Sequence, residues 1–233
     1  MSRAKIERFL FAVVLAAFLS QAAHAASACL DPSGEWSSEC FETRGGQRQV
    51  KKAYRRNLRV DRSGFATLTI KSPRELVAVD RRGVVVVSGI YFWGDFDHPN
   101  PDGGISRFSV PADSGKRKCG YFNDTTFAVV VAAIWDNCTS FRNGEASACN
   151  GCVRYCTEAD CQHSVLIGGD SSLTFDAKGN VTGRERPVML DQACPEGAAP
   201  RTWMDGSTMH LKCPSPNAPL MDIGVAEFPL DVR

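Results

Sequence analysis

The sequence predicts a mainly β protein, made of degenerate β-hairpin repeats in one disulfide-stabilised domain with few short helices. Short β-branched runs alternate with turn residues, which is the pattern of hairpins. One turn motif, Asp-x-x-Gly, recurs between such runs. Ten cysteines follow an N-terminal segment of the secretory type, and an even cysteine count in an exported chain is typical of a disulfide framework.

The Asp-x-x-Gly motif occupies residues 61–64, 80–83 and 176–179, each time between two predicted strands. The Asp side chain accepts backbone hydrogen bonds at the start of a turn, and Gly adopts a positive φ at its end. Each motif therefore predicts a tight hairpin. Its recurrence indicates a repeat unit within residues 58–182.

The strongest internal match aligns residues 77–93 with residues 121–137, and its Val-rich centre predicts equivalent strands in the two copies. The aligned pairs are Asp80 with Asp124, Val85–Val87 with Val129–Val131, Ile90 with Ile134, and Tyr91 with Trp135. The last pair predicts two aromatic side chains at equivalent strand ends.

The second copy contains, in order, Cys119–Phe122, Val129–Val131, Ile134–Asp136 and Phe141–Ala146. This order resembles the bacterial WG repeat, which runs Trp-Gly-Tyr-Ile, a turn, a Val/Ile strand, an aromatic-Asp pair and Phe-x-x-Gly-x-Ala. The first copy resembles it in Asp80, Gly83, Val84–Val87, Tyr91 and Gly104. The chain departs from the pattern because Cys119 replaces the Trp, and Ala132 and Ala133 replace prolines. The resemblance implies β-hairpin repeats in an exported protein with a binding or structural role and no defined catalytic centre.

The N-terminus has the three parts of a secretory signal peptide. These are a basic start, the apolar run Phe9–Leu19, and the small residues of Ala23-His24-Ala25. We expect residues 1–25 to be removed, leaving residues 26–233 as a single domain in the periplasm or secreted, with no transmembrane segment. The alternatives are lipidation of Cys29, and a buried helix or membrane anchor, although the run is shorter than the ~20 residues of a membrane-spanning helix.

The ten cysteines predict structural disulfides. Proximity in the chain favours Cys29 with Cys40, Cys119 with Cys138 and Cys194 with Cys213, and leaves Cys149, Cys152, Cys156 and Cys161 of the Cys-rich segment 149–161 to pair among themselves. Two other interpretations of that segment remain: a redox pair at Cys149-x-x-Cys152, and a zinc site that includes His163. Residues 191–233 are predicted to be an irregular C-terminal segment.

The overall charge is close to neutral, but one segment of the chain is strongly basic. The chain has 27 Lys and Arg against 26 Asp and Glu, which excludes a strongly basic nucleic-acid binder. Residues 44–62 nevertheless carry eight basic side chains against one acid, Asp61, and the spacing of Val50, Tyr54 and Leu58 predicts a short amphipathic helix there. This segment is either a solvated face or a patch for an anionic glycan or membrane surface.

Polar and aromatic residues gather in segment 91–104, which interrupts the repeat. Loops on rigid scaffolds often carry function. We expect a binding site there, formed by Tyr91, Trp93, Asp95, Asp97 and His98, with Trp93 as its apolar anchor. The alternatives are a Ca²⁺ site formed by Asp95, Asp97, Asn100 and Asp102, a pair of glycosidase carboxylates, and an ordinary surface loop.

Together these features predict an exported, non-catalytic binding or interaction protein of the WG-repeat type, with a cell-envelope glycan or a protein as partner. We expect no cofactor, no metal and no nucleic acid. The second hypothesis is an extracytoplasmic enzyme: either a thiol-disulfide protein that uses Cys149 and Cys152, or a hydrolase that uses Asp95 and Asp97.

Overall fold

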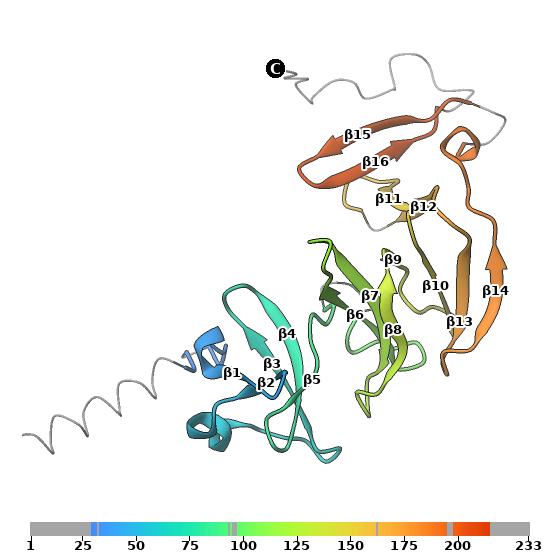
Figure 1. The fold of residues 1–233 in the computed structure, drawn as a ribbon. Helices are drawn as coiled ribbons and strands as arrows, with labels where there is room; N and C mark the ends of the chain where they lie inside the picture. Colours follow the sequence, from blue (N-terminus) through green and yellow to red (C-terminus); the bar gives the residue numbers. More distant parts are fainter. Residues whose placement is uncertain are drawn as a thin grey trace, which may run out of the picture. The chain divides into compact units, whose positions relative to one another are not determined.

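The computed structural model describes residues 29–31, 33–92, 94, 97–161, 163–194 and 198–214. These residues are mainly β, as the sequence predicts (Figure 1). The predicted signal peptide lies outside them. None of the helices that they form has the length and apolar character that a membrane crossing requires. The chain divides into two compact units, Met1–Ile134 with Ser140–Gly144, and Trp135–Thr139 with Glu145–Arg233.

The first unit contains a hairpin and two three-stranded antiparallel sheets, in the strand orders β1-β2, β3-β4-β5 and β6-β7-β8. Two short 3-10 helices, η1 (Ser38–Cys40) and η2 (Lys52–Asn57), flank the hairpin. The strands are β1 (Phe41–Arg44), β2 (Gln47–Val50), β3 (Phe65–Ile70), β4 (Glu75–Asp80), β5 (Val85–Val87), β6 (Ile105–Pro111), β7 (Arg117–Asn123) and β8 (Val129–Trp135).

The second unit contains two four-stranded sheets, in the orders β14-β13-β10-β9 and β12-β11-β16-β15. In the described part of these two sheets β11 and β16 pair in parallel, and the other neighbouring strands pair antiparallel. The elements are β9 (Asn137–Cys138), β10 (Glu145–Cys149), β11 (Val153–Cys156), β12 (Ser164–Ile167), β13 (Ser172–Asp176), β14 (Val181–Glu185), η3 (Leu190–Gln192), β15 (Arg201–Asp205) and β16 (Thr208–Lys212).

The hairpin β15–β16 lies inside the C-terminal segment that the sequence predicts to be irregular. Asp205 and Thr208 are partners at its end, so Gly206 and Ser207 form a two-residue turn. Gly206 has a φ of +55°, which suits glycine in such a turn. The Asp-Gly dipeptide between two short runs was therefore a hairpin signal that the sequence interpretation missed.

All three predicted Asp-x-x-Gly turns form. Two of them join paired strands, β4 with β5 and β13 with β14, whereas residues 58–60, before the turn at 61–64, form no strand, so the first predicted hairpin is wrong. A fourth turn at residues 31–34 has the same closing hydrogen bonds. In each turn the Gly N–H donates to the Asp carbonyl, at 2.8–3.1 Å. The Asp N–H in turn donates to the carbonyl four residues later, at 2.8–3.0 Å. Each Gly has a positive φ, from +80° to +94°. Because the closing hydrogen bonds lie within the turn itself, its local structure depends mainly on its own residues, which is why the motif can be recognised in the sequence.

The pKa values of the four turn carboxylates are all lowered by hydrogen bonds. The Ser63 hydroxyl and the backbone N–H of Phe65 hold the pKa of Asp61 below its usual value. Hydrogen bonds from Ser33 do the same for the pKa of Asp31, and those from Asn180 for the pKa of Asp176. At Asp80 burial acts in the opposite direction, but hydrogen bonds from Val84 and Arg82 outweigh it and lower the pKa. (Each of these carboxylates accepts amide hydrogen bonds from its own turn.)

Because these pKa values are lower in the folded chain, the folded state binds fewer protons than the unfolded state in acid. The contribution to stability is present above about pH 4 and is lost as pH falls through the lowered values. We expect the combined variant Asp61→Asn, Asp80→Asn, Asp176→Asn to show a smaller fall in Tm between about pH 4 and 2 than the wild type, because Asn keeps an acceptor oxygen and does not titrate.

Thermal unfolding followed by circular dichroism across this pH range measures the effect. Asp113→Asn is the matched control, because the exposed Asp113 side chain makes no hydrogen bond within the described residues. Equal acid sensitivity of the triple variant and this control would show that the turn carboxylates do not set the pH dependence.

The aligned copies occupy equivalent places, since β4–β5 and β7–β8 are each the second and third strands of a three-stranded sheet. The turns between them differ in length. Asp80 N–H bonds to Val84, whereas Asn123 N–H bonds to Ala128, one residue further along. Asn123 therefore occupies the turn position that Asp80 has in the first copy. The Asp124 carboxylate is then not needed to close the turn and can bond elsewhere.

Gly120 of the second copy lies where β7 and β8 are close together. A β-carbon at this position would lie 2.4 Å from the carbonyl oxygen of Val131 and 2.8 Å from backbone atoms of Ala132 and Ala133. Glycine in a strand interior commonly marks such an approach of two backbones. The glycine of the Cys-Gly-Tyr-Phe motif is thus required by packing.

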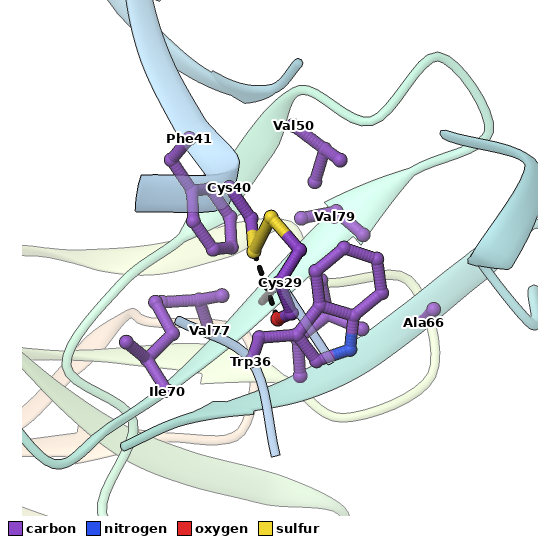
Figure 2. Packing of buried hydrophobic residues seen from close by; sticks show 10 residues of the cluster. Cys29, Trp36, Cys40, Phe41, Val50, Ala66, Ile70, Val77 and Val79 are labelled. Carbon is purple, nitrogen blue, oxygen red and sulfur yellow. Dashed lines mark hydrogen bonds between the residues drawn. A yellow bond between two sulfur atoms is a disulfide. The ribbon is translucent and has the colours of Figure 1, made fainter. Parts of the chain in front are cut away.

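The first core cluster surrounds the Cys29–Cys40 disulfide (Figure 2). Both cysteines are buried, and Trp36 and Val50 are buried beside them. Further members come from β3 and β4 of the neighbouring sheet, including Ala66, Ile70, Val77 and Val79. The disulfide therefore closes the segment between Cys29 and Cys40 on itself, and the closed segment packs against residues of β3 and β4.

Candidate functional site

The segment between β5 and β6 forms an organised loop around a buried ion pair. Asp97 is 7% exposed, and its Oδ1 accepts hydrogen bonds from Arg107 Nη2 at 2.5 Å and Nε at 3.2 Å. Its Oδ2 accepts from the backbone N–H of Gly94 at 3.1 Å. Both carboxylate oxygens are thus engaged by the protein, as expected for a buried charge.

The same arginine supports Tyr91. The Arg107 guanidinium carbon lies 4.8 Å from the centre of the Tyr91 ring, which is a cation–π contact. The backbone adds a second link, because Tyr91 N–H donates to the Arg107 carbonyl at 3.1 Å. Tyr91 remains 36% exposed. The result is an aromatic ring held at the surface by a guanidinium that is itself held by Asp97.

A second polar cluster holds the other half of the loop. His98 Nδ1 lies 2.9 Å from Asp124 Oδ1, and the Asn100 N–H donates to Asp124 Oδ2 at 2.7 Å. The His98 ring also contacts the rings of Phe122 and Phe127, at centroid distances of 5.5 and 5.7 Å. Asp124 therefore connects the loop to the turn between β7 and β8. It can do so because Asn123, and not Asp124, closes that turn.

Asn100 and Asp102 close the loop against its neighbours. Asn100 is buried, and its Nδ2 donates to the carbonyls of Ile105 at 2.8 Å and Phe141 at 3.3 Å. Its Oδ1 accepts from the Asp102 N–H, while Asp102 Oδ2 accepts from the N–H of Asn143. Of the oxygens expected to bind Ca²⁺, both of Asp97, Oδ1 of Asn100 and Oδ2 of Asp102 accept internal hydrogen bonds, and Asp95 lies outside the described residues. The described residues contain no group of three or more His, Cys, Asp or Glu placed to hold a metal ion.

The five expected site residues fall into three groups. Tyr91 is exposed, and Asp97 is buried. His98, whose side chain is 10% exposed, lies in the neighbouring polar cluster of the same loop. Trp93 and Asp95 lie outside the described residues. Trp135, the aligned counterpart of Tyr91, belongs to the second unit, where it is half-buried with its ring 5.7 Å from Phe175.

Arg107 and Asp124 are the organising residues that sequence interpretation missed. Arg107 had no local signal, because it is a single basic residue within β6 and its partner Asp97 lies ten residues away in the preceding loop. Asp124 did carry a signal, but the alignment matched it to the turn residue Asp80. Noticing that Asn123 precedes it, and that Asn also caps turns, would have indicated a one-residue difference.

The cysteines are all disulfide-bonded. The expected pairs Cys29–Cys40 and Cys194–Cys213 form, and segment 149–161 pairs internally as Cys149–Cys152 and Cys156–Cys161. Cys119 and Cys138 are bonded as well. A zinc site would need thiolates, which these sulfurs are not. His163 instead lies 2.9 Å from Glu158.

Cys149 and Cys152 connect the end of β10 to the start of β11 and are buried. Asn137 Nδ2 donates to the Cys152 carbonyl at 2.8 Å, which fixes the turn between them. A reactive Cys-x-x-Cys pair is typically exposed at a helix N-terminus, where the thiolate is stabilised. This position between two strands favours a structural bridge.

Comparison with protein-family models, with curated proteins and with solved structures finds no match to this chain.

Proposed function

We propose that the protein is an exported, non-catalytic binding protein of the WG-repeat type, and that its ligand site includes the surface around Tyr91. The observation that carries the proposal is the chain of contacts from Asp97 through Arg107 to Tyr91. In this chain of contacts a buried ion pair, whose desolvation opposes folding, holds the Tyr91 ring in place while the ring stays exposed. Such pre-organisation lowers the entropy cost of binding.

The same contacts disfavour hydrolysis by Asp97. A catalytic carboxylate must reach the substrate, either as general base or as nucleophile. Asp97 is buried, and both of its oxygens accept hydrogen bonds from Arg107 and Gly94. His98 is likewise directed to Asp124. These groups build the loop, so the exposed aromatic surface is the part left for a ligand.

The chemistry of that surface suits a sugar ring or a planar peptide group. A tyrosine ring offers a flat apolar face together with a hydroxyl that donates and accepts hydrogen bonds. Trp93, expected as an apolar anchor, is two residues from Tyr91 in the chain. A cell-envelope glycan is the ligand class that best fits this surface and the expected export.

Glycan and peptide arrays probed with wild type and Tyr91→Ala test the proposal. We expect Tyr91→Ala to weaken binding by about 2 kcal/mol, roughly thirtyfold, which is typical of an aromatic hot spot. Tyr91→Phe should retain most of the affinity. Thermal unfolding should change little in both, because the ring is 36% exposed. Array signals that are the same for wild type and Tyr91→Ala would refute this site.

The thiol-disulfide alternative is tested separately by mild reduction of the folded protein. A buried structural bridge at Cys149–Cys152 should resist reductant concentrations that open exposed disulfides. Alkylation and mass spectrometry of peptides that contain residues 149–152 provide the measurement. Selective opening of this bridge before the others would favour the redox function over the binding function.

A further inference from the structure

A basic surface forms at one end of the β3-β4-β5 sheet, where two Asp-x-x-Gly turns and the η2 region meet. The two turns are neighbours because Phe65 and Asp80, at their inner ends, are partners across β3 and β4. A β-carbon on Gly64 would lie 2.9 Å from Arg81 Nε, so the Arg81 side chain covers the 61–64 turn.

The η2 region is fixed to the second turn. The Val50 N–H donates to the Gly83 carbonyl at 2.8 Å. A β-carbon on Gly83 would lie 3.2 Å from Val50, 3.4 Å from Leu58 and 3.5 Å from Arg55. Residues 51–62 and 80–83, which are separated by two strands in the sequence, therefore contribute to one surface.

The charge of this surface is strongly one-sided. The two segments carry eight Lys and Arg against two Asp, whereas the chain has 27 basic and 26 acidic side chains, which leaves 19 basic and 24 acidic elsewhere. The basic residues of this surface are Lys51, Lys52, Arg55, Arg56, Arg59, Arg62, Arg81 and Arg82. The positive charge is thus concentrated where the fold joins the segments.

Most of these side chains have no carboxylate partner. Arg55 donates to the Val50 carbonyl and to Gln49, and Arg82 pairs with Asp80 at 3.0 Å. The other six form no ion pair within the described part of the chain. The carboxylates of Asp61 and Asp80 are occupied by the amides of their own turns.

We infer that this basic surface binds an acidic polysaccharide. Six of the eight side chains are arginines, whose planar guanidinium matches carboxylate and sulfate groups bidentately. A bilayer surface is less suitable, because membrane-binding segments combine basic residues with an apolar face. Among the described side chains of residues 51–62 and 80–83, Val60 is the only large hydrophobic residue that is exposed. This surface does not include Tyr91. Of the proposed function, the inference uses only the export of the protein and not the ligand site around Tyr91.

The test measures binding to heparin and to polygalacturonate, with neutral dextran as a blank, at increasing salt. Arg56→Ser, Arg59→Ser, Arg62→Ser removes three exposed charges of the surface. The matched control Lys116→Ser, Lys178→Ser, Arg186→Ser removes three exposed charges outside the basic segment. We expect the first variant to lose at least tenfold in affinity and to show a weaker salt dependence, and the control to stay within about twofold.

Thermal unfolding of both variants checks that the fold is retained, and Tyr91→Ala should bind both polyanions as the wild type does. Equal losses in the two triple variants would show that only net charge matters and would overturn the inference. It would also be overturned by absence of binding to both polyanions, or by binding to phosphatidylglycerol vesicles without binding to either polysaccharide. A failed Tyr91 array together with the expected polyanion results would refute the first site and leave this one standing.

Discussion

Arg107→Ala should destabilise the folded protein by about 3–5 kcal/mol, the cost of leaving a buried charge unpaired. Asp97 is 7% exposed, and its Oδ1 accepts two hydrogen bonds from Arg107. Removal of the guanidinium leaves this carboxylate buried without its counter-ion. The free energy of unfolding, measured by urea denaturation at neutral pH, provides the test.

The double variant Asp97→Ala, Arg107→Ala separates the unpaired charge from the lost packing. Because it removes both charges, it should be more stable than Arg107→Ala alone. If the double variant is instead less stable by the sum of the two single effects, the two residues act independently and the pair does not organise the loop.

Replacing both Cys29 and Cys40 with Ala should cost about 2–5 kcal/mol, the usual effect of losing a native disulfide in a small exported domain. The bond closes the N-terminal segment within the first core cluster, and both cysteines are almost completely buried (Figure 2). The substitution also leaves space beside Trp36 and Val50, which adds a cavity term.

Cys156→Ala, Cys161→Ala is the matched comparison, because that bond closes a loop with a separation of 5 residues rather than 11, and Cys161 is exposed. A shorter loop constrains the unfolded chain less. Urea denaturation should therefore show a smaller loss for this variant. A larger loss here than for the Cys29–Cys40 bond would contradict the assigned importance of the N-terminal core.

The features that could be predicted from the sequence are those that local chemistry determines. The Asp-x-x-Gly turns form as expected because the hydrogen bonds that close them lie within five consecutive residues. The bridge Cys29–Cys40 and the pairing within segment 149–161 follow from short separations along the chain. The spacing of Val50, Tyr54 and Leu58 predicted a short amphipathic helix, of which the structure has only the 3-10 helix η2 around Tyr54. Val50 ends β2 and Leu58 caps η2.

The features that escaped prediction depend on contacts distant in the sequence. His98 meets Asp124 across 26 residues, and Asn100 meets Phe141 across 41. Periodicity carries no information about such pairs. The basic surface was predicted only in part for the same reason. The basic run within residues 44–62 is visible in the sequence, but Arg81 and Arg82 lie beside it only because β3 pairs with β4.

Arg107→Lys tests most directly whether Arg107 holds Tyr91 ready for a ligand. Lysine keeps a positive charge for Asp97 but loses the planar guanidinium that lies against the Tyr91 ring. The measurement is the affinity of wild type, Arg107→Lys, Tyr91→Ala and the double variant for the best ligand from the arrays. The account predicts that Arg107→Lys weakens binding in the wild type and has no further effect once Tyr91 is alanine. Wild-type affinity in Arg107→Lys, or full additivity of the two losses, would contradict it.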